Sequence, residues 1–201
     1  TDFLSVDIHF REGDIRYDIN HSWLCLKSAD IPRFKIPWRL WAEQGYLTLV
    51  DDVEISADLV VDWIAEHATR YNIVKIALDN FRYALLSKAL KQIGFDAAEY
   101  KNVKLVRPSD IMKVVPVIDS CFVNKYFVWG DNPPLRWATN NTKLIRSGKS
   151  AGQDTGNYVY GKIEAKSRKT DPFMALAASM VIEEELGAGG STFDDLPVIV
   201  C

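Results

Sequence analysis

The first twenty residues alternate between apolar and polar side chains with a period of two. The apolar positions of the first segment are Leu4, Val6, Ile8 and Phe10. Residues 11–14 include a glycine and two acidic residues typical of a turn, and the same period resumes over residues 15–19. Successive side chains of a β-strand point to opposite faces, so the pattern predicts two strands joined as an antiparallel hairpin.

Apolar residues with helical spacing follow further along the chain. This spacing predicts a short amphipathic piece at 38–44, helices over 57–68, 81–93 and 109–123, and a last helix over 172–186. Ser56 is a typical N-cap residue, and Gly45 and Gly94 are typical helix stops. Pro172 stands where proline is favoured, at the first position of a helix capped by Thr170 or Asp171.

A continuous apolar run at residues 73–78 is typical of a strand buried at the centre of a sheet. Shorter strands are predicted at 46–50 and 104–106. Strands that alternate with helices after an antiparallel start predict an α/β fold, in which helices flank a central mixed β-sheet. No Gly/Ser linker interrupts the chain before residue 186, so we expect one domain over 1–187 and a flexible acidic tail over 188–201.

The composition is that of one globular domain, with 201 residues, 48% hydrophobic and 25% charged. These values exclude a disordered chain, a collagen-like fibre and a disulfide-rich miniprotein. No apolar run is long enough to span a bilayer. The three cysteines form no C-x-x-C pair, which fits a reducing compartment. The chain begins within a strand-like alternation and without Met, so we expect it to be a piece of a longer protein.

The formal net charge of −3 by itself argues against a nucleic-acid partner. Its distribution is uneven, however, because residues 143–169 carry +5 and the remainder of the chain −8. The basic residues of this polar, glycine-rich loop are Lys143, Arg146, Lys149, Lys162, Lys166, Arg168 and Lys169. A solvated charged face would explain the loop equally well, but such a loop also suits contact with a phosphate backbone.

Two carboxylates stand at notable positions, and that of Asp79, at the carboxyl end of a central strand, is where ligands gather in open α/β sheets. Asp79 follows the predicted central strand directly, and Asp171 follows the basic loop at the start of the last helix. Each residue taken alone is also a common turn or N-cap residue. The spacing therefore leaves a structural and a functional interpretation open for both.

Three motifs, in the same order, resemble the nuclease domain of phage large terminases. They are Ile76-Ala77-Leu78-Asp79-Asn80-Phe81-Arg82, residues 130–141 with Asn132-Pro133, Leu135, Trp137 and Asn141, and the basic run Lys166–Lys169 followed by Asp171 and an Ala-rich helix. The resemblance implies an RNase H-like, integrase-type fold with a central mixed sheet whose first three strands are antiparallel. It also implies metal-dependent endonuclease cleavage of double-stranded viral DNA during genome packaging.

By this resemblance, Asp79 and Asp171 hold Mg²⁺ or Mn²⁺, with two ions expected, and the basic loop contacts DNA. Residues 1–6 resemble the later part of the family's first-strand motif, so the primary acidic ligand is expected before residue 1 and Asp2 becomes a supporting carboxylate. A metal site that lacks this first ligand would be incomplete. Hard divalent cations prefer such oxygen ligands, and a pair of them can activate water and stabilise the leaving oxygen.

The same resemblance implies partners and a location. The expected partners are double-stranded DNA, the portal protein and the small terminase subunit, with no membrane, in the host bacterial cytoplasm at the procapsid portal. The packaging motor's phosphate-binding loop is absent from the sequence, so ATP hydrolysis is not expected. The alternatives are a catalytically silent DNA- or portal-docking module, and another RNase H-like nuclease such as a resolvase or transposase.

Overall fold

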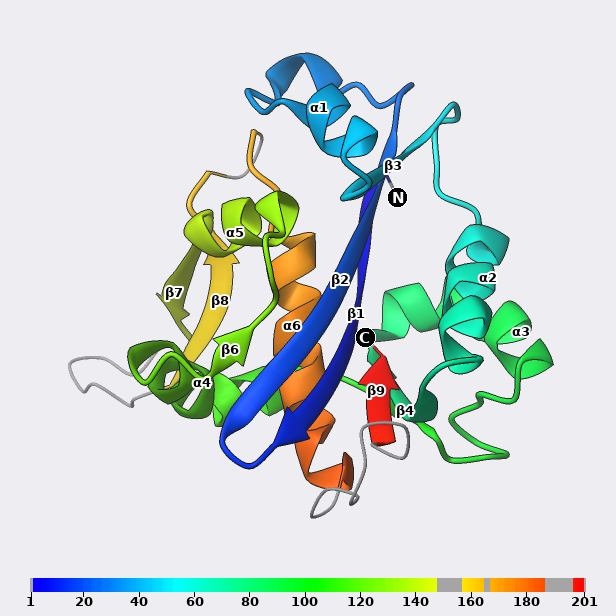
Figure 1. The fold of residues 1–201 in the computed structure, drawn as a ribbon, viewed down its shortest axis with the longest axis vertical. Coiled ribbons are helices and arrows are strands. Elements are labelled where there is room, and N and C mark those ends of the chain that lie inside the picture. The colour runs from blue at the N-terminus through cyan, green and yellow to red at the C-terminus, as the bar shows by residue number, and fades with distance from the viewer. Residues whose placement is uncertain (1, 148–156, 165–166, 187–196, 201) are drawn as a thin grey trace.

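The computed structural model describes residues 2–147, 157–164, 167–186 and 197–200. In this part of the chain, seven strands form one mixed sheet in the order β3-β2-β1-β9-β4-β5, and β6 pairs with β2 (Figure 1). The strands are β1 (Phe3–Glu12), β2 (Ile15–Cys25), β3 (Leu47–Val50), β4 (Asn72–Leu78), β5 (Val103–Leu105), β6 (Phe127–Val128) and β9 (Pro197–Val200). The α-helices are α1 (Trp38–Glu43), α2 (Ala57–Ala68), α3 (Asn80–Gln92), α4 (Pro108–Val123), α5 (Pro133–Asn140) and α6 (Asp171–Ile182).

The predicted N-terminal hairpin is confirmed. β1 and β2 pair antiparallel from Phe3 opposite Leu24 to Glu12 opposite Ile15. Only Gly13 and Asp14 lie between the two strands, and Gly13 has a φ of +59°. Glycine adopts this left-handed backbone conformation without the Cβ clash that other residues meet, which explains the position of the turn.

The third strand runs in the direction opposite to the expected one. The first three strands were expected to be antiparallel, but β3 pairs parallel with β2, from Ser22 opposite Leu47 to Cys25 opposite Val50. A parallel neighbour requires a crossover connection. Residues 26–46 provide it here, since they contain the short 3-10 helix η1 (Ile31–Arg33) and the helix α1.

Helices cover both faces of the sheet. The apolar face of β1 packs with α2 and α3 in one core, which includes Val6, Ile8, Ile64 and Leu90. A second core joins α4, α5 and α6 on the opposite face. Figure 1 shows α2 and α3 on one side of the β1–β2 hairpin and α4 to α6 on the other.

The local helix signals agree with the structure. Ser56 caps α2, with its hydroxyl accepting from the backbone N–H of Leu59, and Gly94 follows α3 with a φ of +89°. α4 begins at Pro108, one residue before the predicted start, and α6 continues into the 3-10 helix η2 (Glu183–Leu186). Leu85 differs from expectation, because its side chain is 55% exposed instead of lying on the buried face of α3. None of the described helices is long and apolar enough to cross a membrane.

Two strands lie in the segment expected to be a polar loop. β7 (Thr142–Arg146) and β8 (Tyr158–Lys162) pair antiparallel as a separate two-stranded sheet. Lys143 and Arg146 interrupt the apolar rhythm of β7, and several of its side chains are exposed, so no clear buried face is visible in the sequence.

The expected flexible tail also contains a strand. Pro197–Val200 form β9, which lies between β1 and β4, antiparallel to β1 and parallel to β4. Val200 is 1% exposed, so this part of the chain belongs to the core. Residues 187–196 lie outside the described residues, and with them the expected domain boundary at 187.

Candidate active site

Asp79 lies where β4 ends and α3 begins. It is the N-cap residue of α3, and its Oδ1 accepts a hydrogen bond of 2.9 Å from the backbone N–H of Arg82. The N-cap interpretation left open by the sequence is therefore confirmed. Capping uses only Oδ1 of this carboxylate. The other oxygen, Oδ2, accepts a hydrogen bond from Nη1 of the Arg82 guanidinium.

Asp171 is the first residue of α6, and its side chain is 16% exposed. Its position in the first turn places a negative charge at the positive end of the helix dipole, where it is favoured. Asp171 Oδ1 accepts a hydrogen bond of 2.8 Å from Nη2 of Arg82. One guanidinium thus joins Asp79 to Asp171, although the two carboxylates stand 92 positions apart in the sequence.

A cavity of about 300 Å³ opens beside this pair. Both carboxylates and Arg82 line it, together with Ser5 of β1 and Arg107 at the start of α4. The rest of its wall is largely apolar and consists of Ala77, Leu78, Val106, Pro108, Ile111, Val159, Met174, Ala175 and Ala178, with Tyr160. The carboxylates therefore face a partly enclosed space at the carboxyl end of β4, where ligands bind in open α/β sheets.

Arginine contacts set the charge state of Asp79. Burial alone would raise the pKa of this carboxyl, but the backbone N–H and the guanidinium of Arg82 outweigh burial and hold the pKa below its ordinary value. An ionised carboxylate beside a second one requires a compensating cation. Arg82 supplies this positive charge in the structure.

The pair fits a hard divalent cation by its donor chemistry. Both residues offer carboxylate oxygens, which Mg²⁺ and Mn²⁺ prefer, and both already converge on a single positive group. Two protein carboxylates leave most of the coordination to water or substrate oxygens, as is usual for Mg²⁺.

Asp2 lies in a different cluster. Its Oδ2 accepts from Lys169 Nζ at 2.9 Å and from the Ser28 hydroxyl at 3.0 Å. Lys169 also donates to Asp30 at 3.1 Å. Burial raises the pKa of Asp2, but the Lys169 ammonium more than compensates and lowers it. Asp2 is not among the residues that line the cavity. Its partner Lys169 stands two residues before Asp171 and so links the Asp2 cluster to the cavity through the chain.

The described basic residues of the 143–169 segment do not share one surface. The register of β7 and β8 places Lys143 on one face of the small sheet and Arg146 and Lys162 on the other. Arg168 donates to Asn141 Oδ1 at 3.2 Å, and the Lys169 side chain is only 12% exposed. Lys149 and Lys166 lie outside the described residues.

A ladder of polar side chains is buried between the hairpin and α6, and neither the ladder nor Arg82 was predicted. We call it the polar ladder; its cross-strand pairs are Ser5–Ser22, Asp7–Asn20 and His9–Asp18. His9 Nδ1 lies 2.7 Å from Asp18, and Nε2 lies 3.1 Å from Glu183 of η2. The alternation in β1 showed a second, polar face, but only the packing of α6 makes it an interior face.

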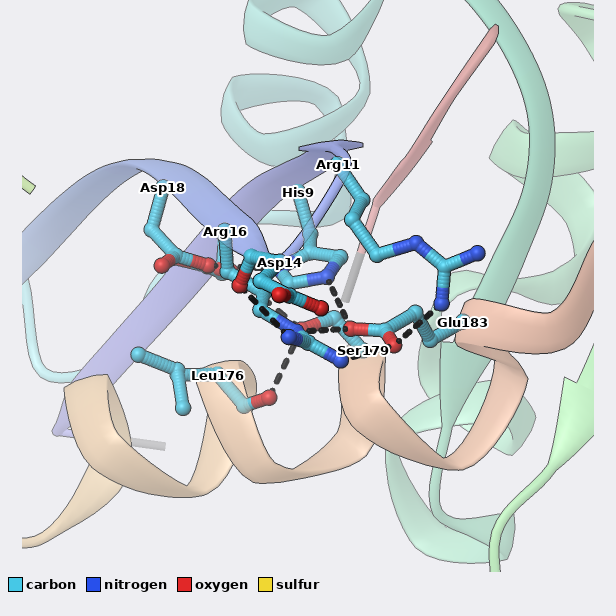
Figure 2. Close-up of polar contacts among 9 residues, drawn as sticks. His9, Arg11, Asp14, Arg16, Asp18, Leu176, Ser179 and Glu183 are labelled. Carbon is cyan, nitrogen blue, oxygen red and sulfur yellow. Dashed lines mark hydrogen bonds and ion pairs between the residues drawn. The ribbon is translucent and has the colours of Figure 1, made fainter. Parts of the chain in front are cut away.

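Glu183 is the point where several charges of this interior meet (Figure 2). Arg16 donates to both of its carboxylate oxygens, at 2.8 and 2.9 Å, and Arg11 donates at 3.0 Å. Burial opposes the charge, but His9 and Arg16 lower the pKa of Glu183 to about 2. Burial likewise opposes the His9 charge, yet Asp18 and Glu183 raise the pKa of His9 to about 9.

Asp7, His9 and Asp18 form a group that could hold a metal ion, since each offers a ligand atom and these atoms lie within 4.8 Å of one another. Both ring nitrogens of His9 already face carboxylates, however, those of Asp18 and Glu183, and these contacts raise the pKa of the ring. A metal would have to displace these contacts inside a fully buried face. In this structure the group is part of a buried ion network, whereas the Asp79–Asp171 pair faces a cavity.

The mixed sheet with helices on both faces gives the chain a terminase-like, RNase H-like architecture. The comparison with solved structures finds similarity to the crystal structure of the HK97 bacteriophage large terminase, with a TM-score of 0.73 and 19% sequence identity. The similarity covers 90% of this chain and 36% of that one, so the chain spans about a third of the terminase's length. No protein-family model and no curated protein matches the sequence. At 19% identity, this structural similarity establishes the fold alone.

Proposed function

We propose that the chain is a nuclease module of the terminase type, which cleaves double-stranded DNA with the help of Mg²⁺ or Mn²⁺ during viral genome packaging. One observation carries the proposal: Asp79 and Asp171, from two distant elements, converge on one positive group beside a cavity. The proposal agrees with the terminase-like fold.

The chemistry needs a cation at the scissile phosphate. A divalent ion supplies Lewis-acid stabilisation of the phosphoryl oxygens and lowers the pKa of a bound water. In our proposal Asp79 and Asp171 hold it through the oxygens that now face Arg82. Arg107, exposed at the rim of the same cavity, is placed to attract a DNA phosphate. A second ion, as the resemblance implies, would need further oxygen ligands from DNA or protein.

The sheet leaves room for a third carboxylate beside Asp79. β9 pairs with β1 only at Ile8 and His9, and it pairs with β4 no further than Ile76. Beyond that point, no described strand lies between Ser5 of β1 and the end of β4, and both line the cavity. An extended segment that continued the line of β9 could present an acidic side chain at the pair. We propose that a further acidic ligand fills this place, with Asp2, which Lys169 contacts two residues before Asp171, as a more distant supporting carboxylate.

DNA would approach across the end of the molecule where α6 begins. Besides the basic residues of β7 and β8, Lys35 and Arg39 are exposed in and before α1. The ion pair between Lys169 and Asp30 ties this segment to the residues just before α6. Figure 1 shows α1 at the same end of the molecule as the N-terminus. Such basic side chains contact phosphates without reading sequence. Lys143, Arg146, Lys149, Lys162, Lys166, Arg168 and Lys169 remain proposed DNA contacts.

The portal protein and the small terminase subunit are proposed as further partners at the procapsid portal in the host cytoplasm, in keeping with the likeness to a large terminase. A pull-down with purified portal protein tests the first partnership. Binding that persists in the presence of excess DNA would separate a protein contact from a DNA bridge.

Plasmid nicking in Mn²⁺ tests the proposed activity. Asp79→Asn and Asp171→Asn should each abolish nicking, because each removes a ligand charge while preserving side-chain size. Asp62→Asn provides the matched control, since Asp62 is an exposed carboxylate on α2, on the far face of the sheet. Unchanged cleavage by either active-site variant would overturn the assignment, provided that its circular dichroism spectrum and thermal melt match those of the wild-type chain.

A catalytically silent DNA-binding module is the second candidate. It is favoured by the observation that Asp79 and Asp171 are the only carboxylates among the described residues that line the cavity. This candidate predicts salt-sensitive DNA binding with no nicking in millimolar Mn²⁺. Nicking that begins only when a longer form of the protein is used would instead identify an enzyme whose site needs a further segment.

A further inference from the structure

Arg82 is the one side chain that contacts both carboxylates of the proposed metal pair in the described structure. Its guanidinium lies between Asp79 Oδ2 and Asp171 Oδ1, and the Arg82 side chain is 33% exposed. We infer that Arg82 is a built-in counter-ion that competes with the divalent metal for these two carboxylates. The inference rests on the proposed function in one respect, because it takes Asp79 and Asp171 as the metal ligands.

The backbone fixes Arg82 in this position. Asp79 caps α3, and the residue whose N–H it accepts is Arg82 itself. Residues three apart on a helix lie on the same side, so the Arg82 side chain starts beside Asp79 and reaches Asp171 on the neighbouring helix. The planar fork of a guanidinium can serve two acceptors at once, whereas an ammonium offers a point charge.

A bridging metal would need the same oxygens. Asp79 Oδ1 already accepts the N-cap hydrogen bond, so Oδ2 is the freer oxygen for a new ligand, and it is the one that Arg82 contacts. A guanidinium and a divalent cation cannot both lie within bonding distance of one carboxylate oxygen pair without strong mutual repulsion. Metal entry therefore requires the Arg82 side chain to swing away.

The exposure of Arg82 makes this exchange feasible. A guanidinium that is a third exposed can return to water, and it shares the cavity with Arg107. Once displaced, it stays within one side-chain length of the pair, because its backbone is fixed by the N-cap. When no metal is bound, Arg82 therefore keeps the two carboxylates together. When a metal is bound, the displaced Arg82 becomes a second phosphate-binding group at the cavity, beside Arg107.

Isothermal titration of the full chain with Mn²⁺, without DNA, tests the inference by binding rather than by activity. Arg82→Gln should bind Mn²⁺ about tenfold more tightly than wild type, equivalent to about 1.4 kcal/mol. Arg82→Lys, which keeps the charge but loses the fork, should fall between the two. Arg107→Gln is the matched control: it removes a charge from the same cavity but touches neither carboxylate, so it should produce a much smaller gain.

Equal Mn²⁺ affinity of wild type and Arg82→Gln would overturn the competition while leaving the metal centre intact. Equal gains in Mn²⁺ affinity from Arg82→Gln and Arg107→Gln would also overturn the competition, because they would show that removing any positive charge from the cavity has the same effect. Absence of Mn²⁺ binding in both wild type and Arg82→Gln would overturn the metal centre as well. If Arg82→Gln loses stability, thermal melts supply a second reading: Mn²⁺ should raise its melting temperature more than it raises that of wild type.

Discussion

Glu183→Gln removes the negative charge at the centre of the buried ion network while nearly preserving the shape of the side chain. In wild type, Glu183 accepts hydrogen bonds from Arg16 and Arg11 and contacts His9, and its side chain is 8% exposed. The variant leaves buried cations without their partner. Breaking a buried ion pair in this way costs about 3 kcal/mol.

The pKa shifts give a similar magnitude. The pKa of Glu183 falls from 4.5 to about 2, which corresponds to about 3 kcal/mol of stability. Since the folded pKa is depressed, this stability is present above pH 4.5 and is lost as the pH falls toward 2. The pKa of His9 rises from 6.5 to about 9, so the stabilisation from its charge is full below pH 6.5 and is lost as the pH rises through 9. The two shifts describe partly the same contact and do not add.

Urea unfolding followed by circular dichroism at pH 6, 7, 8 and 9 measures the stability lost on substitution and its dependence on the charge of His9. Asp7, whose pKa is raised by burial and by Asp18, adds a pH dependence of its own, so the difference between variant and wild type is the quantity to compare. We expect the variant to be about 3 kcal/mol less stable at pH 6 and the difference to shrink toward pH 9. A loss below about 1 kcal/mol that does not change with pH would show that Glu183 does not stabilise the buried network.

Three further predictions concern packing and turns, each measured as the free energy of unfolding in urea. Gly13→Ala should cost about 1 kcal/mol, because the φ of +59° strains any residue with a Cβ; no loss would contradict this turn geometry. Asn132→Ala should cost about 2 kcal/mol, since its side chain caps α5 and donates to the Asn20 carbonyl at 2.8 Å; a cost below 0.5 kcal/mol would exclude that buried role. Leu176→Ala, at a fully buried position of α6, should cost about 3 kcal/mol, and the exposed Leu85→Ala under about 1 kcal/mol; equal losses would contradict the placement of these helices.

The elements governed by neighbouring residues could be predicted from the sequence. The hairpin turn at Gly13, the Ser56 cap and the stop at Gly94 depend on backbone sterics and on hydrogen bonds within a few positions. β7 and β8 were not predicted because each is a strand through its pairing with the other, which the local sequence does not show. Lysine and arginine within β7 also hide any buried face in the sequence pattern. β9 was missed because its apolar run is four residues long and owes its place to β1 and β4.

The candidate site divides in the same way. Local pattern and motif were enough to predict that Asp79 follows a strand and that Asp171 stands at the start of a helix. Long-range packing, by contrast, brings the two carboxylates to Arg82, pairs Asp2 with Lys169 instead, and buries the second face of the hairpin as the polar ladder. Local conformation is set by residues a few positions apart, whereas the meeting of charges depends on how β4, α3 and α6 pack, and this packing is a property of the whole chain.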